Sequence, residues 1–408
     1  MKKVWDKWTR IALVKRILVG LILGAILGIA VPQATGIAIL GDVFVSALKA
    51  IAPLLVFFLV ISSLCNAGKS HGGVIKTVII LYMFSTVLAA VIAVFASMAF
   101  PVKMTLANAA TDTSAPQGIV EVLNNLLLNV VANPVSSLVN ANYVGILMWA
   151  VLLGLAFRVA DKMTKKVLAD VADGISMVVT WIINLAPFGI FGLVFNTVST
   201  NGLDIFTTYG KLLILLVGCM LFIYFVTNPL LVYWCIRQNP YPLIFHCLKR
   251  SALTAFFTRS SAANIPVNMK VCEEMGLDRD TYSVTIPLGA TINMDGAAIT
   301  ITVMTMATAF TLGIHVDIPT AIILSLLAAL SACGASGVAG GSLLLIPMAC
   351  SLFGISDDIS MQVVAVGFII GVVQDSVETA LNSSSDLLLS ASAEFRQWRL
   401  EGEEIKFK

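Results

Sequence analysis

Charge and histidine are scarce in this sequence. Asp, Glu, Lys and Arg make up only 12% of the 408 residues, and the net charge is +2. The basic residues sit in short polar breaks and form no single patch, so we expect no nucleic-acid partner. The three histidines, His71, His246 and His315, lie near expected loops, so no nucleophile and base come together and no enzyme is predicted.

Paired cysteines are also missing. The seven cysteines are scattered, and none forms a CxxC pair. Most lie within or beside apolar segments, so the sequence supports neither a zinc site nor a disulfide framework. They fit better as small apolar fillers of a packed interior.

Apolar sequence is abundant. Hydrophobic residues make up 58% of the chain, and the mean hydropathy is +0.95. A helix needs ~20 apolar residues to cross the ~30 Å hydrocarbon core of a bilayer, and the runs here are continuous, which excludes an alternating β-barrel pattern. We therefore predict an all-α integral membrane protein. Its eight expected transmembrane helices are residues 11–31, 38–66, 74–100, 120–157, 171–197, 210–236, 282–314 and 361–393.

Two further apolar segments are interrupted by polar or glycine-rich sequence. Residues 243–269 contain Thr258-Arg259-Ser260-Ser261, and residues 319–353 contain a glycine-rich stretch at 334–342. A chain that reverses inside the bilayer needs small residues and must satisfy its exposed backbone groups, so both segments predict re-entrant hairpins. Close packing of helices through small residues is the simpler alternative.

The distribution of Lys and Arg predicts the orientation. Basic residues flank the first span, follow the second, fourth and sixth spans, and recur after residue 393. Because cytoplasmic loops are enriched in Lys and Arg, both termini are expected in the cytoplasm. The two hairpins then enter from opposite sides. Such an inverted repeat is typical of a transporter with its site near the middle of the membrane.

The last span carries a polar stripe. Its members, at offsets of 0, 4, 7 and 11 residues, are Asp375, Thr379, Asn382 and Asp386. On a helix they share one face within roughly 60°. Ionisable groups inside hydrocarbon are costly and mark a pathway or binding site. A cavity that binds a zwitterion and cations fits this stripe better than a channel, which needs rings of like groups.

Four motifs carry a resemblance to a known family. Thr258-Arg259-Ser260-Ser261, Asn293-Met294-Asp295-Gly296 and Gly337-Val338-Ala339-Gly340 resemble the hairpin and broken-helix motifs of the dicarboxylate/amino acid:cation symporter family, which includes glutamate transporters. The sequence from Gln374 to Asn382 resembles that of its bacterial sodium-coupled serine/threonine branch. The resemblance covers essentially the whole chain.

The resemblance implies roles for the stripe. Asp375 matches the carboxylate that receives the substrate's ammonium group, and Asn382 and Ser261 match groups that hold its carboxylate. The full set of substrate-binding positions implied is Asp375, Asn382, Ser260, Ser261, Thr379, Glu378, Arg259, Val338, Ser342 and Ala297.

It also implies sodium sites built from oxygen ligands, which suit an alkali cation. The first would use Asp386, Asn382 and carbonyls near Gly289 and Asn293. The second would use Asn293 and Asp295 with Tyr82, Ser85 and Thr86, which share a helix face at offsets of 0, 3 and 4. A third would use Thr291, Met294 and the backbone of Ala332, Cys333 and Ala335. Taken alone, the hydroxyl cluster at residues 82–86 is also typical of structural back-bonding to carbonyls.

Two departures from the glutamate transporters favour a small neutral substrate. Glu378 stands where acidic-substrate members place an arginine, and Ala297 where they often carry threonine. An anion at 378 repels an acidic side chain. Serine or threonine fits best, with Ser342 or Glu378 as hydroxyl partner. The alternatives are proton coupling, or sodium-coupled transport of another small neutral amino acid or a dicarboxylate.

Arg259 needs a partner if its hairpin tip lies in the membrane. Glu378 and Asp375 are the candidate partners, and Arg259 would then compete with ammonium and sodium for the same anions. Alternatively, its side chain extends to the cytoplasmic interface.

The resemblance finally implies an architecture. Residues 1–408 form one transporter unit, in which spans at 11–66 and 120–197 are a scaffold, and 74–100 with 210–393 carry the substrate. It implies an elevator-type movement within a homotrimer in the bacterial cytoplasmic (inner) membrane.

Overall fold

The computed structural model describes residues 11, 13–66, 73–106, 128, 131–202, 204–333, 335, 340–403 and 405. These residues form helices and connecting turns, with no strand among them, so the prediction of an all-α chain is confirmed for this part of the sequence. The helices, in chain order, are α2 (Leu13–Ala30), η1 (Thr35–Ala38), α3 (Ile39–Asn66), α4 (Gly73–Ala99), α6 (Pro134–Val139), α7 (Tyr143–Ala156), η2 (Phe157–Val159), α8 (Lys162–Asn184), α9 (Ala186–Asn201), α10 (Asp204–Phe222), η3 (Ile223–Thr227), α11 (Asn228–Ile236), α12 (Tyr241–Cys247), η4 (Leu248–Ala252), α13 (Leu253–Thr258), α14 (Ser261–Glu274), α15 (Arg279–Ile292), α16 (Asp295–Thr311), α17 (Ile318–Ala332), η5 (Gly341–Leu345), α18 (Ile346–Ser351) and α19 (Asp357–Glu401).

Several of these helices are long and apolar enough to cross a membrane. In the described part of the chain, six segments meet that condition: Thr35–Ser62, Gly73–Ala99, Lys162–Asn184, Phe206–Ile236, Arg279–Thr311 and Asp357–Glu401. Shorter apolar helices lie at Gly145–Val159, Ala186–Thr200, Ile318–Ala332 and Gly341–Ser351. The chain is therefore a multi-pass membrane protein by length and composition.

The span predicted at 171–197 is divided into two helices. α8 already begins at Lys162, because the Asp161 side chain accepts a hydrogen bond from Thr164 N at 2.7 Å and caps the helix. It ends near Leu185 because Pro187, at the start of α9, has no N–H to continue the helical hydrogen bonds.

Aspartates also cap helices that begin at connecting turns. Asp278 accepts hydrogen bonds from the backbone N–H and hydroxyl of Thr281 at 2.9 and 2.7 Å, and so starts α15. Hydrogen bonding from Thr281 holds the pKa of Asp278 below its usual range. Asp317 starts α17 in the same way through Thr320, with the same lowering of its pKa. The charged cap stabilises each helix start.

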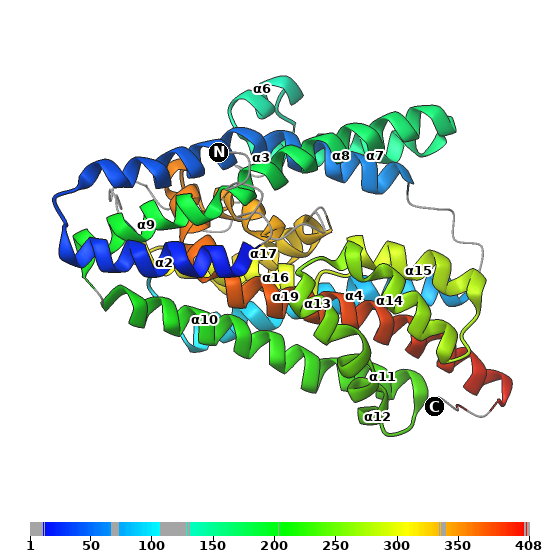
Figure 1. The fold of residues 1–408 in the computed structure, drawn as a ribbon. Helices are drawn as coiled ribbons and strands as arrows, with labels where there is room; N and C mark the ends of the chain where they lie inside the picture. The colour runs from blue at the N-terminus through cyan, green and yellow to red at the C-terminus, as the bar shows by residue number, and fades with distance from the viewer. Residues whose placement is uncertain are drawn as a thin grey trace.

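The helices pack in two groups. In the first, α2 lies along α9, and α3 packs against α7, α8 and α9 (Figure 1). In the second, α4 packs against α16 and α17, while α13, α14, α15 and α16 surround α19. α19 also touches α3 and α9, so it links the two groups.

α19 is the central helix of the second group. It runs for 45 residues, or about 68 Å at 1.5 Å per residue, which is roughly twice the hydrocarbon thickness. In Figure 1 it passes from orange to red between the other helices. Most of its residues from Ile359 to Phe395 are buried, whereas Gln362, Val373, Val377 and Ala380 form one partly exposed face. The polar groups on the buried faces must find partners within the protein.

One helical hairpin is described almost completely. α13 ends at Arg259, whose φ of +52° places it in the left-handed region, and the chain then turns into α14, capped by Ser260. The two arms are joined by Asn264, which donates to Ser251 Oγ at 3.0 Å. In the second segment, α17 and α18 flank the predicted tip, and residues 334 and 336–339 of that tip, including Val338, lie outside the described residues.

Glycines on α2 allow it to touch the α9 backbone. A Cβ atom at Gly20 would lie 2.2 Å from the Pro187 carbonyl oxygen, and one at Gly24 would lie 2.6 Å from that of Phe191. Both distances are far below van der Waals contact. These close approaches hold the first group together, as in other small-residue helix seams.

We expect Gly20→Ala to destabilise the protein, by about 1–3 kcal/mol, because the added methyl group must push the α9 backbone away. Gly218→Ala, in α10, is the matched control, since a Cβ there meets nothing within 4 Å and alanine favours the helix. Thermal unfolding of the purified proteins compares the two. Equal melting temperatures of Gly20→Ala and Gly218→Ala would show that α2 and α9 leave room for a methyl group at residue 20.

Candidate functional site

The polar stripe of α19 is buried. Asp375, Thr379, Asn382 and Asp386 are between 1% and 6% exposed, and they face α16, α4 and both hairpin segments. The structure therefore brings residues from four other parts of the chain to one face of α19. Their contacts divide into three neighbouring centres, around Asp375 with Glu378, around Asn382 with Asp386, and around Asp295.

Asp375 is paired with Arg259. Arg259 Nε lies 2.6 Å from Asp375 Oδ2, and both side chains are largely buried, at 10% and 4% exposed. The other carboxylate oxygen accepts the backbone N–H of Gly340 at 3.0 Å. Arg259 Nη2 also donates to the carbonyl of Gly371 at 3.4 Å. The Arg259 side chain therefore points to α19 in this structure.

Glu378 is held by neutral donors. Its Oε2 atom accepts from Thr300 Oγ1 at 2.7 Å, from Ser342 Oγ at 2.9 Å and from Gln374 Nε2 at 2.5 Å. Gln374 Nε2 also donates to Thr300 at 2.8 Å. Hydrogen bonds to a carboxylate stabilise its charge without a cation. Glu378 thus joins α16, η5 and α19.

Thr300 and Gln374 were not among the predicted site residues. Gln374 lies four residues before Glu378, and this helical spacing is a signal that could have identified it. Thr300 is 78 residues from Glu378 and has no comparable local signal.

Asn382 contacts the break between α15 and α16. Its Oδ1 accepts the backbone N–H of Gly296 at 2.7 Å, and its Nδ2 lies 3.4 Å from Met294 Sδ. The close approach needs glycine, because a Cβ atom at 296 would lie 2.9 Å from Glu378 Cα. Ala297, the next residue, is fully buried. The broken helix is thus held directly against the stripe.

Asp386 on α19 is contacted by groups from α4 and from the end of α15. Its Oδ1 accepts from Asn293 Nδ2 at 2.9 Å, and its backbone carbonyl accepts from the Tyr82 hydroxyl at 2.8 Å. A Cβ atom at Gly289 would lie 2.9 Å from both Asp386 and Tyr82, so only glycine leaves room there. The Oδ1 atom of Asn293 is buried and has no hydrogen-bond partner among the described residues.

Asp295 is enclosed by the hydroxyl groups of α4. Ser85 Oγ donates to one carboxylate oxygen at 2.7 Å, and Thr86 Oγ1 to the other at 3.2 Å. Thr86 Oγ1 also accepts the backbone N–H of Met294 at 3.2 Å. The predicted cluster of Tyr82, Ser85 and Thr86 therefore lies beside Asn293 and Asp295.

The remaining predicted residues lie around these centres. Thr291 Oγ1 donates to the Leu288 carbonyl at 2.8 Å, and Cys333 Sγ lies 3.5 Å from the Ile292 carbonyl, which brings the end of α17 to the end of α15. Ala332 and Ala335 are buried nearby in sequence. Ser260 accepts the Ala263 N–H at 3.2 Å, and Ser261 is buried at the start of α14.

The site carries an excess of negative charge. Asp295, Asp375, Glu378 and Asp386 are all buried, and the described ion pairs place one cation, Arg259, against them. Such acids need compensation from bound cations or from protons. The atoms here that could bind a cation are carboxylate, hydroxyl, amide and carbonyl oxygens. The described residues contain no group of three or more His, Cys, Asp or Glu side chains that could hold a transition metal. This chemistry fits an alkali cation, and the Asn293 oxygen, buried without a hydrogen-bond partner, is available as a further oxygen ligand.

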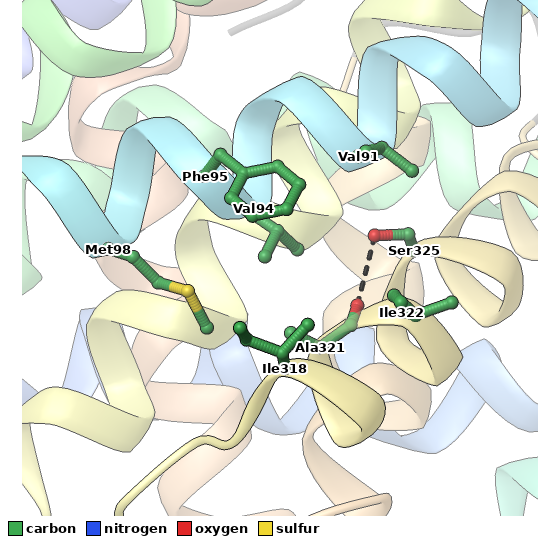
Figure 2. A pocket seen from close by; sticks show the side chains of 8 residues that line it. All are labelled: Val91, Val94, Phe95, Met98, Ile318, Ala321, Ile322 and Ser325. Atoms are coloured by element: carbon green, nitrogen blue, oxygen red, sulfur yellow. Dashed lines mark hydrogen bonds between the residues drawn. The ribbon is translucent and has the colours of Figure 1, made fainter.

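Two cavities lie outside this site. Figure 2 shows one between α4 and α17, with a volume of about 10 Å³ and lined by apolar side chains, in which Ser325 donates its hydroxyl to the Ala321 carbonyl at 3.0 Å. It is too small and too apolar for a polar substrate. A larger cavity of about 240 Å³ lies between α3, α9 and α19, near Asp42, Asn196 and Gln362. Neither cavity contains a residue of the stripe.

Sequence comparison identifies the family. The profile of the sodium:dicarboxylate symporter family matches residues 13–394. The chain belongs to the sodium:dicarboxylate symporter family. The resemblance drawn from the motifs is therefore confirmed, and so is the prediction of a transporter and not an enzyme.

Two similar members of the sodium:dicarboxylate symporter family carry a more specific name. The protein named serine/threonine transporter SstT from Bifidobacterium adolescentis is 57% identical over 406 residues, which cover 99% of this chain and 94% of that protein. The protein of the same name from Streptococcus thermophilus is 55% identical over 400 residues, covering 98% and 100% of the two chains.

We expect Arg259→Gln to destabilise this symporter-family protein by about 3–5 kcal/mol, because it leaves the Asp375 carboxylate buried without its cation. Adding Asp375→Asn should recover most of that loss, since the pair is then removed together. Arg250→Gln, which breaks the exposed pair with Glu274, is the control and should change stability by less than about 1 kcal/mol. Additive effects of Arg259→Gln and Asp375→Asn in thermal unfolding would contradict this pairing.

Proposed function

We propose that this chain imports serine and threonine across the cytoplasmic membrane together with sodium ions. The observation that carries the proposal is the charge pattern of the buried site: Asp375 faces a displaceable arginine, while Glu378 stands beside it with hydroxyl and amide donors only. The names of the two similar proteins support the same substrates.

Asp375 would receive the substrate's ammonium group. In the structure Arg259 occupies that carboxylate at 2.6 Å, so substrate and Arg259 compete for one anion. A buried carboxylate left alone is unfavourable, and Arg259 supplies its counter-charge until the ammonium group arrives. Asn382, with the hairpin residues Ser260 and Ser261 and the tip residue Val338, would hold the carboxylate end.

Glu378 would select the side chain. Its negative charge repels an acidic side chain, whereas a hydroxyl group can join the hydrogen bonds that Thr300 and Ser342 already make to it. Thr379 and Ala297, both buried, would lie beside a short side chain. A substrate without a hydroxyl would leave polar groups unpaired, which costs affinity.

Sodium ions would compensate the remaining acids. One ion fits between Asp386, Asn382, Asn293 and the backbone at Gly289, and a second between Asp295, Asn293, Tyr82, Ser85 and Thr86. A third would lie near Thr291, Met294 and the backbone of Ala332, Cys333 and Ala335. The shared residue Asn293 contacts Asp386 at 2.9 Å and directly precedes the Met294–Asp295 break, so filling one site affects the other.

The proposed architecture has eight transmembrane helices and two re-entrant hairpins, with both termini in the cytoplasm. The group around α19 would carry the substrate and slide against the group formed by α2, α3 and α7 to α9 within a homotrimer. The denser packing within each group than between them supports this division.

Proton coupling is the second candidate. Glu378 favours it, because this buried carboxylate contacts neutral donors and no cation in the described part of the site. A carboxyl group in such surroundings can carry a proton.

Serine uptake into vesicles should require an inward sodium gradient at a fixed and equal pH on both sides, because sodium must compensate Asp295 and Asp386. A panel of neutral and acidic amino acids measured in the same vesicles should show serine and threonine as substrates and glutamate as none. Uptake that persists without sodium, but follows a pH gradient, would favour proton coupling instead.

Glu378→Arg should abolish serine uptake. The variant would place a cation beside the carboxylate that binds the ammonium group, and it would remove the acceptor of the hydrogen bonds from Thr300 and Ser342. Glu378→Gln, which keeps the size and removes the charge, should retain part of the uptake. Both variants are first checked for folding by thermal unfolding. Serine uptake at the wild-type rate in Glu378→Arg would remove Glu378 from the proposed site.

A further inference from the structure

Asn228 lies against the Asp295 centre and belongs to none of the residue sets described above. It is the first residue of α11 and is fully buried. Its Nδ2 donates to Ser385 Oγ on α19 at 3.0 Å. Its Oδ1 lies 3.5 Å from Ser85 Oγ, which also donates to Asp295 at 2.7 Å. The bond to Ser385 sets the orientation of the amide, so that its oxygen faces Ser85.

A π-helical turn precedes this residue. The segment η3, Ile223–Thr227, has the wider hydrogen-bonding pattern, and Asn228 with Pro229 follows directly. Such turns recur at functional sites because they change the register of the residues that follow. Pro229 has no N–H, and the carbonyl of Phe225 accepts instead from the Tyr241 hydroxyl at 3.3 Å. The irregularity is thus supported by its neighbours.

The hydroxyl protons at Asp295 indicate what Asn228 does. In the structure, Ser85 donates to the Asp295 carboxylate, and the Thr86 hydroxyl lies within hydrogen-bonding distance of both Asp295 and the Tyr82 carbonyl. A cation in this centre would take the lone pairs of the two hydroxyls and of Asp295, so each hydroxyl must direct its proton to another acceptor. For Thr86 that acceptor is the Tyr82 carbonyl, at 3.0 Å. For Ser85 it is Asn228 Oδ1.

We propose that Asn228 is a positioning residue for sodium at Asp295, which it supports by accepting the Ser85 hydroxyl proton when the ion binds. The inference rests on the proposed sodium coupling. Asn228 acts through Ser85 and does not need to touch the ion. Groups that orient a ligand in this way commonly change metal affinity by about 10–100-fold when they are removed.

The test measures sodium binding to the purified protein without amino acid. Binding is monitored as the increase in melting temperature with sodium concentration. Asn228→Ala should raise the half-saturating sodium concentration by about 10-fold or more. In a Ser85→Ala background the same substitution should have little further effect, because the hydroxyl through which Asn228 acts is gone. Asn228→Leu, which keeps the volume of the side chain and removes the amide, should also raise the half-saturating concentration and serves if Asn228→Ala does not fold.

The matched control is Asn268→Ala. Asn268 is also a buried asparagine bound to the same serine run of α19, with Nδ2 donating to the Ser383 carbonyl at 2.8 Å. This control should lower the melting temperature but leave the sodium dependence unchanged. Wild-type sodium affinity in Asn228→Ala, or an effect fully additive with that of Ser85→Ala, would overturn the inference about Asn228. Either result would leave the proposed sodium coupling intact. Absence of any sodium effect on the wild-type protein would overturn the proposed sodium coupling as well.

Discussion

Four buried carboxylates with one arginine among them constrain the rest of this structure. Asp295, Asp375, Glu378 and Asp386 lie where water is excluded, and Arg259 neutralises one of them. An uncompensated charge in such a place costs several kcal/mol. Each acid is therefore surrounded by donors from distant parts of the chain, and these donors determine how the helices must approach one another.

Glycine residues allow the helices to approach one another closely at the site. Gly296 lets α16 touch α19 beside Glu378, and Gly289 leaves the space between Asp386 and Tyr82. Serines on α19 bind buried asparagines of neighbouring elements, as Ser383 binds Asn264 and Ser385 binds Asn228. A helix that is buried over most of its surface can carry so many polar groups because most of them find a partner within reach. The packed interior and the polar site are built from the same contacts.

The Arg259–Asp375 ion pair connects α19 with both hairpin segments. The arginine sits on a turn with left-handed backbone at the end of α13, and its partner Asp375 is bound at the same time by the Gly340 N–H. Any cation that replaces Arg259 at Asp375 therefore acts on contacts of both hairpin segments. In the proposed function, replacement of Arg259 by the substrate's ammonium group would therefore link substrate binding to the backbone of both hairpin segments.

Composition and periodicity were sufficient to predict that the chain lies in a membrane, that it is helical and that α19 carries a polar stripe. Hydropathy and the 3.6-residue repeat are local properties that can be read from the sequence. The motifs were sufficient for the family. Local pattern left the partner of Arg259 open between Asp375 and Glu378, and the structure pairs it with Asp375. It also missed Thr300 and Asn228, which meet Glu378 and Ser85 across more than 70 residues of sequence. Such contacts depend on where the chain reverses and on the register change at a π-helical turn, and neither leaves a periodic signal, so only the tertiary structure decides them.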